Sequence, residues 1–582
     1  MLNNQITKIN NHPYLVPIIL LFIACINFLQ AGFTELFHDE AYYWIWSRTL
    51  ACGYYDHPPM IAWLIRLGTN LFNHEFGVRF FTVILNVCTL FILYLLTDKK
   101  QPLIFFTLLL ASPFVHIAGI LSVPDLPFIF FVAAYLYCYR KFITENTWFS
   151  TLLLALAVTG MLYSKYHGMM MMFFTILSHP KLLIQRKFWA IVLLSFTLYL
   201  PHFLWAYQHE FDTLKYHLFG RTRSGYKINF TLDYLTGEIA AAGGIIGIWV
   251  FYEAFLAKTT DQFTKSLKYI IVGIFGFLFI RTFSQHVEAN WAASAFLPLF
   301  LLAYQGISAK PQHFHWVYKI SIPTIVILLI ARLFLVWNFL PASVYKIRNE
   351  FHGWQNWANQ IQEVAKDCPV VFNNTYQYPS KYMFYGNKNT SELIPMLKNQ
   401  KYIATSLNSV HYRHNQYDIA NYEEQIQGKR VMWIVTYPFE DTMKVLKTST
   451  GEDLYYKFVD NFHSFNKVKI KLLSDKRTFK ANEEVTFPIV LTNGYNYPCE
   501  FSACTSYPTF IGISFWQKEV HKWEYSQYLQ EPLAKDTLKD TLKKEVTFKM
   551  PSVAGEYDMT LMLQMGKVYT GYNMPIIKIK VE

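Results

Sequence analysis

Long apolar stretches recur along the first 340 residues of this 582-residue chain and then stop. Most have about 15 to 25 residues, close to the length with which a helix crosses a ~30 Å hydrocarbon layer. The chain is 53% hydrophobic and only 16% charged, which argues against a soluble protein of several domains. About eleven membrane-spanning helices are therefore expected, the sixth being the shortest. They cover residues 14–31, 79–97, 103–121, 126–140, 148–163, 168–179, 188–206, 233–256, 269–283, 291–307 and 319–340.

The charges between these stretches predict their orientation. One set of alternate connections is rich in cations, which only Asp98, Glu145 and Asp261 oppose. The cations are Lys8, Lys99, Lys100, Arg140, Lys141, Lys181, Arg186, Lys187, Lys258, Lys265, Lys268, Lys310 and Lys319. Because positive loops stay in the cytoplasm, this set and the N-terminus are expected inside and the tail after residue 340 outside. The first stretch is expected to stay as an anchor, since no cleavage site of a signal peptide follows it.

The chain becomes polar near residue 341, and two further domains are expected there. Residues 341–462 combine a helix-like pattern with short apolar strand runs, which predicts a small extracytoplasmic α/β domain. Residues 463–582 alternate apolar and polar residues between turns, which is typical of a β-sandwich of about seven strands. Cys499 and Cys504 in this region either close a short disulfide or remain two thiols.

Polar clusters fill the connections that are predicted to face outward. Acids, imidazoles and cations are costly to desolvate at a bilayer surface, so their accumulation suggests a site. The clusters lie at residues 37–59, 122–127, 163–168, 205–227 and 286–291.

Asp39 and Asp125 are the candidate catalytic carboxylates within these clusters. A carboxylate can take the proton of an acceptor hydroxyl, while cations stabilise an anionic leaving group. Sugar transfer from a lipid phosphate needs both, and a lipid donor would explain why the enzyme lies in a membrane. The candidate substrate-binding residues are Glu40, Tyr42, Asp56, His57, Lys165, His167, His217, Arg221, Arg223, Glu288 and Asn290.

Each cluster also has a structural interpretation. Asp39, Glu40 and Asp125 suit the first turn of a helix, where a carboxylate caps backbone N–H groups. Aromatic residues such as those at 42–46 form interfacial belts, and a lysine such as Lys165 can extend toward lipid headgroups. The location of all five clusters on one predicted face favours a shared site over these separate explanations.

A metal site is not indicated by the sequence. His286 and Glu288 offer only two ligands, and the cysteines have no metal-ligand spacing. A divalent ion is compatible with the expected chemistry, but no cofactor is predicted. No nucleic-acid partner is expected either.

Five motifs together resemble a known family. They are Asp-Glu-Ala-Tyr-Tyr-Trp at 39–44, Tyr-Asp-His-Pro-Pro at 55–59, Pro-Asp at 124–125, Ser-Lys-Tyr-His-Gly at 164–168 and Ala-Asn-Trp at 289–291. As an ordered set within residues 1–340 they are similar to bacterial members of the protein O-mannosyltransferase superfamily, including the lipid A aminoarabinose transferases. The resemblance implies a GT-C fold and an inverting glycosyltransferase that uses a polyprenyl-phosphate sugar outside the cytoplasmic membrane.

The resemblance also implies roles for individual residues. Asp39 takes the place of the family's first-loop acid, which acts as general base or orients the acceptor. Asp125 matches the essential acid of the second outward loop, and Lys165 matches a lysine with a phosphate-binding role. Tyr42 and His57 stand where the aminoarabinose branch has two cations, so the identity of the sugar is left open, although a protonated His57 would still attract phosphate.

Three functions are compatible with these observations. The first is transfer of a hexose, hexosamine or amino-pentose from a polyprenyl-phosphate carrier to lipid A or a related envelope glycolipid, in a bacterial inner membrane whose lipids surround the protein. The second is the same transfer to exported protein or to surface polysaccharide. The third is a non-catalytic flippase for lipid-linked sugars or an envelope assembly protein. A transporter would be expected to show internal repeats and polar mid-membrane helices, whereas here the polar residues gather on one face, which favours an enzyme.

Overall fold

The structure is a computed structural model with two compact units, Met1–His352 and Gly353–Glu582. It describes residues 10, 12–209, 211–215, 226–339, 350–373, 375–387, 404–407, 426–438, 441–463, 465, 467–502, 507–517, 522–528, 532–533, 536–565 and 568–582. The two units have different architectures, and each is described by itself.

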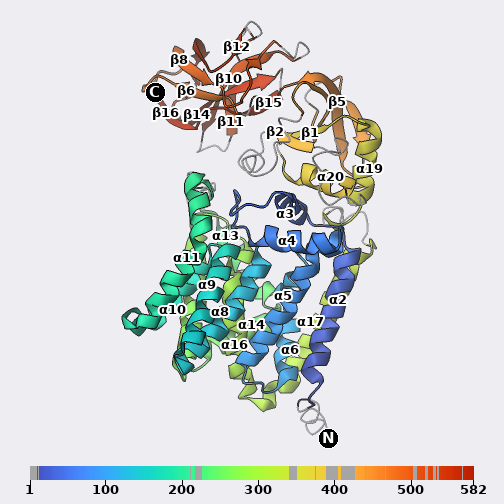
Figure 1. Ribbon diagram of the computed structural model, residues 1–582, viewed down its shortest axis with the longest axis vertical. Coiled ribbons are helices and arrows are strands. Elements are labelled where there is room, and N and C mark those ends of the chain that lie inside the picture. Colours follow the sequence, from blue (N-terminus) through green and yellow to red (C-terminus); the bar gives the residue numbers. More distant parts are fainter. Residues whose placement is uncertain are drawn as a thin grey trace. The chain divides into compact units, whose positions relative to one another are not determined.

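The first unit is a bundle of α-helices (Figure 1). Among the described residues, seven helices are long and apolar enough to cross a membrane. They are α2 (Leu15–Phe33), α5 (Glu75–Leu96), α8 (Asp125–Glu145), α11 (Arg186–Gln208), α15 (Gln262–Arg281), α16 (Ala293–Ser308) and α17 (Phe314–Val336), the last two each lengthened at the start by a 3-10 helix, so that these spans cover Ala289–Ser308 and Pro311–Val336. Two shorter apolar helices are α9 (Trp148–Ser164) and α10 (Gly168–Ser178). The prediction of a polytopic helical membrane protein is confirmed, but the number of eleven spans is not.

Two of the expected spans are broken helices. The first forms α6 (Pro102–Leu110) and α7 (Pro113–Ala118), and the second forms α13 (Ile228–Ala241) and α14 (Ile245–Leu256). Pro113 has no backbone N–H to continue α6. Between α13 and α14 the axis bends by 93°. Gly243 and Gly244 provide this bend, with φ values of 124° and 63° that a side chain would disfavour. Hydropathy cannot reveal either break, because the residues on both sides stay apolar.

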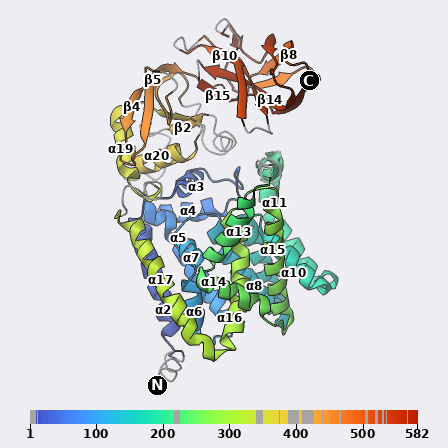
Figure 2. The same ribbon diagram turned by 180° about the vertical axis from the view of Figure 1, so that it is seen from behind.

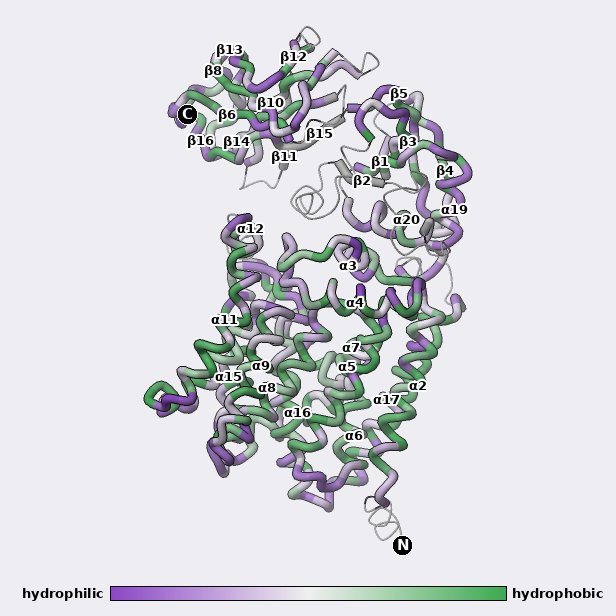
Figure 3. The backbone as a smooth tube through the Cα atoms, viewed as in Figure 1, coloured by the Kyte–Doolittle hydropathy of each residue, from purple (hydrophilic) through white to green (hydrophobic). Residues whose placement is uncertain are grey.

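Two helices outside the expected spans, α3 (His38–Arg48) and α4 (Met60–Leu71), lie across one end of the bundle (Figures 1 and 2). On α4, Ile61 and Ile65 are buried against the unit, whereas Leu67 and Leu71 are exposed. Figure 3 shows that the spanning helices are mainly hydrophobic and that hydrophilic residues gather toward the ends of the bundle. A two-faced helix at such an end is typical of the membrane interface.

Short elements complete the connections of the first unit. The α-helix α12 covers Asp212–Lys215, and the 3-10 helices η1, η3 and η4 cover Pro180–Ile184, Ala289–Ala292 and Pro311–His313. η3 is followed directly by α16 and carries Asn290 and Trp291 of the last polar cluster, whereas His286 and Glu288 precede it.

The second unit begins with an α/β region. Its sheet has the strand order β2-β1-β3-β5-β4, in which β1 is parallel to β2 and β3, and β5 is antiparallel to β3 and β4. The elements are α19 (Trp354–Ala365), β1 (Val370–Asn373), α20 (Gln377–Asn387), β2 (Ala404–Leu407), β3 (Lys429–Val435), β4 (Lys444–Lys447) and β5 (Asp453–Phe462). The buried apolar runs of β1 and β3 match the strands expected from the sequence.

The rest of the second unit is rich in strands, as predicted. The strands are β6 (Lys469–Leu472), β7 (Thr478–Phe479), β8 (Glu484–Thr492), β9 (Cys499–Glu500), β10 (Thr509–Gln517), β11 (Lys522–Tyr528), β12 (Thr537–Leu538), β13 (Thr541–Lys549), β14 (Gly555–Met565), β15 (Val568–Tyr572) and β16 (Ile577–Val581). One sheet has the order β11-β10-β14-β16-β7 with β15 beside β14, another has β13-β8-β6, and β12 pairs with β9. The ring centroids of Phe479 in β7 and Phe487 in β8 lie 5.8 Å apart, so side chains of the sheet that contains β7 contact side chains of the sheet that contains β8. The boundaries at 340/341 and 462/463 remain our proposal for the domains.

Candidate active site

Three of the predicted site residues, from three different segments, form one polar cluster. Lys165 follows the last residue of α9, and its Nζ lies 2.6 Å from Oδ1 of Asp125, the first residue of α8. The other carboxylate oxygen of Asp125 accepts a hydrogen bond of 3.0 Å from Nδ2 of Asn290 in η3. The Lys165 side chain is only 5% exposed and that of Asp125 13% exposed. The cation is thus held almost completely away from solvent beside a single carboxylate.

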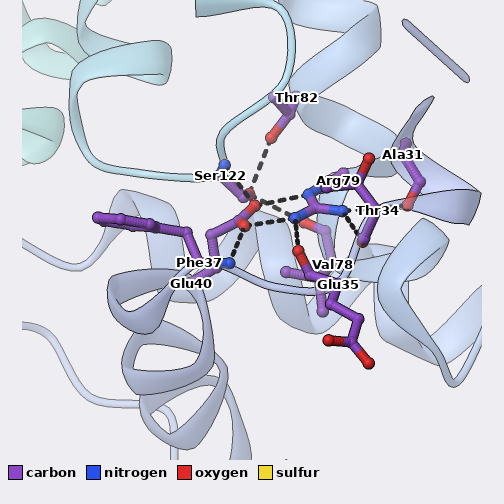
Figure 4. Close-up of polar contacts among 9 residues, drawn as sticks. All are labelled: Ala31, Thr34, Glu35, Phe37, Glu40, Val78, Arg79, Thr82 and Ser122. Carbon is purple, nitrogen blue, oxygen red and sulfur yellow. Dashed lines mark hydrogen bonds and ion pairs between the residues drawn. The ribbon is translucent and has the colours of Figure 1, made fainter. Parts of the chain in front are cut away.

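A second charged pair, Glu40 and Arg79, lies nearby in the fold and is fully buried (Figure 4). Arg79 of α5 donates from Nε and Nη2 to the two carboxylate oxygens of Glu40, over 2.7 and 2.5 Å. Its remaining N–H groups donate to the backbone carbonyls of Ala31, Thr34 and Glu35, at the end of α2 and just beyond it. Arg79 therefore fastens α3 to α2 and α5.

Glu40 also joins the two segments that carry the candidate catalytic acids (Figure 4). Its Oε1 accepts from the backbone N–H of Ser122 over 2.8 Å, and its Oε2 accepts from the N–H of Phe37 over 2.8 Å. The Ser122 hydroxyl contacts the Thr82 hydroxyl at 2.8 Å. Asp39 precedes Glu40 by one residue, and Asp125 follows Ser122 by three. The Glu40 carboxylate thus fixes both segments to one point of α5, and its contact with substrate stays a prediction.

The loop that carries Asp56 and His57 is held between α3 and α11. The Tyr54 hydroxyl donates to the carbonyls of Trp46 and Thr49, and its ring stacks on Trp46 with centroids 4.4 Å apart. Gly53 lies so close to α11 that a Cβ there would stand 2.3 Å from the Trp205 ring. This loop therefore requires a glycine at position 53.

His202 of α11 connects this loop to the segment after Lys165. Its Nδ1 lies 2.7 Å from the Cys52 carbonyl, which can only accept, so Nδ1 carries the proton. Nε2 of His202 then accepts from the Tyr166 hydroxyl over 2.9 Å. Burial raises the pKa of Tyr166 above its ordinary value, so the phenol stays protonated and keeps this bond. The sequence analysis missed His202, because a single histidine in an apolar helix carries no pattern.

The remaining predicted residues are distributed around these contacts. Asp39 is half-buried in the first turn of α3, Tyr42 is buried against Trp46, and Asp56 is 9% exposed. His57 and His167 are half-buried, with their rings 6.2 Å from Tyr43 and Trp291, respectively. Glu288 is exposed and lies 3.4 Å from His286. His217, Arg221 and Arg223 lie outside the described residues.

The described residues offer no group of three or more His, Cys, Asp or Glu side chains that could hold a metal ion. The cluster of Asp125, Lys165 and Asn290 instead offers one ammonium and one amide. Such groups hold an anionic substrate by charge and by directed hydrogen bonds.

Residues 56–205 match the family described as dolichyl-phosphate-mannose-protein mannosyltransferase. This range includes Asp125 and Lys165. In structure, the chain resembles ArnT from Cupriavidus metallidurans, whose crystal structure was determined with bound undecaprenyl phosphate. The TM-score is 0.52 at 13% identity, and the match covers 76% of this chain and 98% of ArnT. The fold is of the GT-C type. The predicted resemblance to polyprenyl-phosphate-dependent glycosyltransferases is therefore confirmed.

Two relatives are similar to this GT-C chain in sequence. The lipid A galacturonosyltransferase RgtD of Rhizobium johnstonii is 25% identical over 290 residues, which cover 46% of this chain and 60% of RgtD. An uncharacterized protein of Aquifex aeolicus is 32% identical over 164 residues, which cover 26% of this chain and 33% of that protein. The chain thus spans less than two thirds of either relative.

Proposed function

We propose that this chain transfers a sugar from a polyprenyl-phosphate carrier to lipid A or a related envelope glycolipid, on the outer face of the bacterial cytoplasmic membrane. The observation that carries the proposal is the pair of the buried Lys165 and the partly buried Asp125 with the exposed Asn290 beside it, in a chain with the fold of a protein crystallised with undecaprenyl phosphate. The similarity to RgtD, a lipid A galacturonosyltransferase, supports lipid A as acceptor and a hexuronic acid or another hexose as the sugar.

In the proposed reaction Asp39 accepts a proton and Lys165 stabilises the leaving phosphate. The acceptor hydroxyl oxygen attacks the anomeric carbon of the sugar, and its proton passes to Asp39 as general base. The bond from that carbon to the phosphate oxygen breaks, and polyprenyl phosphate leaves with the bonding electrons. Lys165 stabilises the negative charge that develops on this phosphate.

Asp125 acts through Lys165 in this scheme. Both of its carboxylate oxygens are engaged, one by the Lys165 ammonium and the other by the Asn290 amide. The carboxylate therefore aims the ammonium at the phosphate, and Asn290 keeps the carboxylate in place. His57, and Arg221 and Arg223 outside the described residues, are proposed as further contacts for the donor.

Mass spectrometry of lipid A tests the proposal in cells that lack the protein. The cells are restored with the native chain, with Asp39→Asn, with Asp125→Asn or with Glu145→Gln. Glu145→Gln is the matched control, because this substitution also removes one negative charge from α8, at the end opposite to Asp125. One sugar mass should return with the native chain and with Glu145→Gln, whereas either aspartate variant should reduce transfer at least about 100-fold. Full activity of an aspartate variant, at equal amounts of protein in the membrane, removes that residue from the reaction.

A second acceptor is favoured by the family match at residues 56–205, because that family is named for protein mannosylation. A different outcome is that lipid A is unchanged in all strains while exported proteins lose one sugar in the cells that lack the protein. That result would identify serine or threonine side chains of exported proteins, and not a glycolipid, as the acceptor. Unchanged sugars in lipid A, in exported proteins and in surface polysaccharide would overturn the transferase proposal.

A further inference from the structure

Arg332 carries a positive charge inside the seam between two peripheral helices. Figures 1 and 2 show α2 and α17 side by side at one edge of the bundle, and Arg332 lies on α17. Its side chain is buried, with 8% of the residue exposed. An ionisable group at such a position in a membrane protein is costly and suggests a function.

The hydrogen-bond partners of the Arg332 guanidinium are all neutral. Nε donates to Oε1 of Gln30 over 2.5 Å, and one terminal nitrogen donates to Oδ1 of Asn27 over 2.7 Å. The other terminal nitrogen lies 3.5 Å from Nδ1 of His116. Nε2 of His116 donates to the Leu110 carbonyl over 2.8 Å, so Nδ1 is the acceptor in the contact with Arg332. Neither the amides nor this neutral imidazole supply a negative charge.

The guanidinium therefore lacks both a counter-charge and part of its hydrogen bonding within the described residues. A guanidinium has five N–H donors, and these contacts use three of them. No carboxylate of a described residue bonds to Arg332, whereas Arg79 in the same unit is neutralised by Glu40. A buried cation needs an opposite charge and acceptors for its remaining N–H groups, and a bound anion would provide both.

A small cavity lies next to the guanidinium and has a polar and an apolar part. Its polar lining consists of Asn27, Asn86, His116 and Arg332. The apolar lining consists of Phe22, Ile23, Ile26, Leu110, Val115, Ile325 and Leu329. Phe22 is more than half exposed on the outer side of α2, so the apolar part of the seam continues to the lipid-facing surface. This combination fits an anionic headgroup with a hydrocarbon chain attached.

The depth of the site agrees with such an occupant. Arg332 lies four residues before the end of α17, and Asn27 lies six residues before the end of α2. At 1.5 Å per residue these positions are about 6 and 9 Å below the ends of their helices. The headgroup layer of a bilayer occupies a comparable distance beside the hydrocarbon core.

We propose that Arg332, with Asn27 beside it, binds the phosphate group of an anionic membrane phospholipid, whose acyl chain follows the apolar residues of α2 and α17. This lipid site is separate from the cluster of Asp125, Lys165 and Asn290 and does not depend on the proposed function. The occupant holds α17 against α2 by completing the charge balance between them.

Native mass spectrometry of the full chain tests the proposal. The protein is purified in mild detergent and titrated with phosphatidylglycerol, and the bound fraction is compared between the native chain, Arg332→Gln and Arg281→Gln. Arg281 is the matched control, because it is an arginine in the last turn of another spanning helix, α15. We expect Arg332→Gln to weaken phosphatidylglycerol binding at least 10-fold and Arg281→Gln to leave it unchanged. Equal binding by all three proteins would overturn the proposal.

A second variant keeps the proposal testable if Arg332→Gln does not fold. Gln30→Glu places a carboxylate directly on Nε of Arg332 with almost no change of shape. This internal counter-charge should weaken the binding of phosphatidylglycerol to a similar extent, and unaltered binding would contradict the proposal. Competition identifies the source of the phosphate. Displacement of phosphatidylglycerol by inorganic phosphate would show a site for a free anion. Displacement by equimolar undecaprenyl phosphate would show a site for the polyprenyl carrier. Either result would overturn the proposal that a phospholipid occupies the site.

Discussion

The buried pair of Glu40 and Arg79 allows a prediction with a stated magnitude. Both side chains are completely inaccessible, and Glu40 holds two backbone N–H groups in addition to Arg79. Removing one charge leaves the other buried without compensation, which costs about 3–5 kcal/mol. Glu40→Gln and Arg79→Met should each lower the free energy of unfolding by this amount.

The double variant Glu40→Met/Arg79→Met should cost less than the sum of the single variants, because no uncompensated charge remains. Ser122 and Phe37 still lose an acceptor, so we expect the double variant to stay less stable than the native chain. Unfolding in mixed micelles, followed by tryptophan fluorescence, measures these free energies.

An exposed ion pair of the same unit provides the control. Arg140 and Asp98 lie 2.6 Å apart, but their side chains are 34% and 58% exposed. Asp98→Asn should therefore cost less than about 1 kcal/mol. A loss below 1 kcal/mol for Glu40→Gln, or additive losses in the double variant, would refute the inference that Arg79 depends on the Glu40 charge.

Three further predictions concern single positions. Glu238→Met should raise the free energy of unfolding by about 1–3 kcal/mol, because both carboxylate oxygens are buried without a hydrogen-bond partner among the described residues. A lower free energy of unfolding in the same micelle assay would show that the carboxylate does make a stabilising contact. Gly53→Ala should lower the free energy of unfolding by about 1–3 kcal/mol, because its Cβ clashes with Trp205. Gly276→Ala should not lower it, because no atom lies within 4 Å of the added Cβ. Equal thermal midpoints of the two variants would refute the clash. Burial raises the pKa of Cys499 to about 11, so alkylation at pH 8, mapped by mass spectrometry, should be much slower at Cys499 than at the partly exposed Cys368. Equal rates in the folded chain would contradict this burial, and equal rates after denaturation are expected.

The sequence predicted the membrane class well, because hydropathy over some twenty residues reports directly on burial in lipid. It could not predict the bend at Gly243 and Gly244 or the break before Pro113, since both sides of each break remain apolar. The two adjacent glycines were the available signal for the bend.

The candidate site was predictable where chemistry and position agreed. Asp125, Lys165 and Asn290 were chosen as polar residues on one face, and the structure joins them. Glu40 was chosen by the same reasoning but is bound to Arg79, 39 residues away. Single-sequence patterns do not report on such distant pairings, and an arginine at the start of an apolar stretch resembles an ordinary flanking charge.

The Glu40 carboxylate also limits where the site can open. The proposed lipid donor and glycolipid acceptor are both bulky, so these substrates would need a moving part of the protein to enter and leave. The end of α2, the start of α3, the first two turns of α5 and the turn before α8 are joined by the buried contacts of Glu40 and Arg79, so we expect them to move together or not at all. We therefore expect the substrate entrance to lie away from Glu40 and Arg79, among segments that contact one another only through side-chain packing. Variants that broaden the choice of acceptor should be sought in those segments.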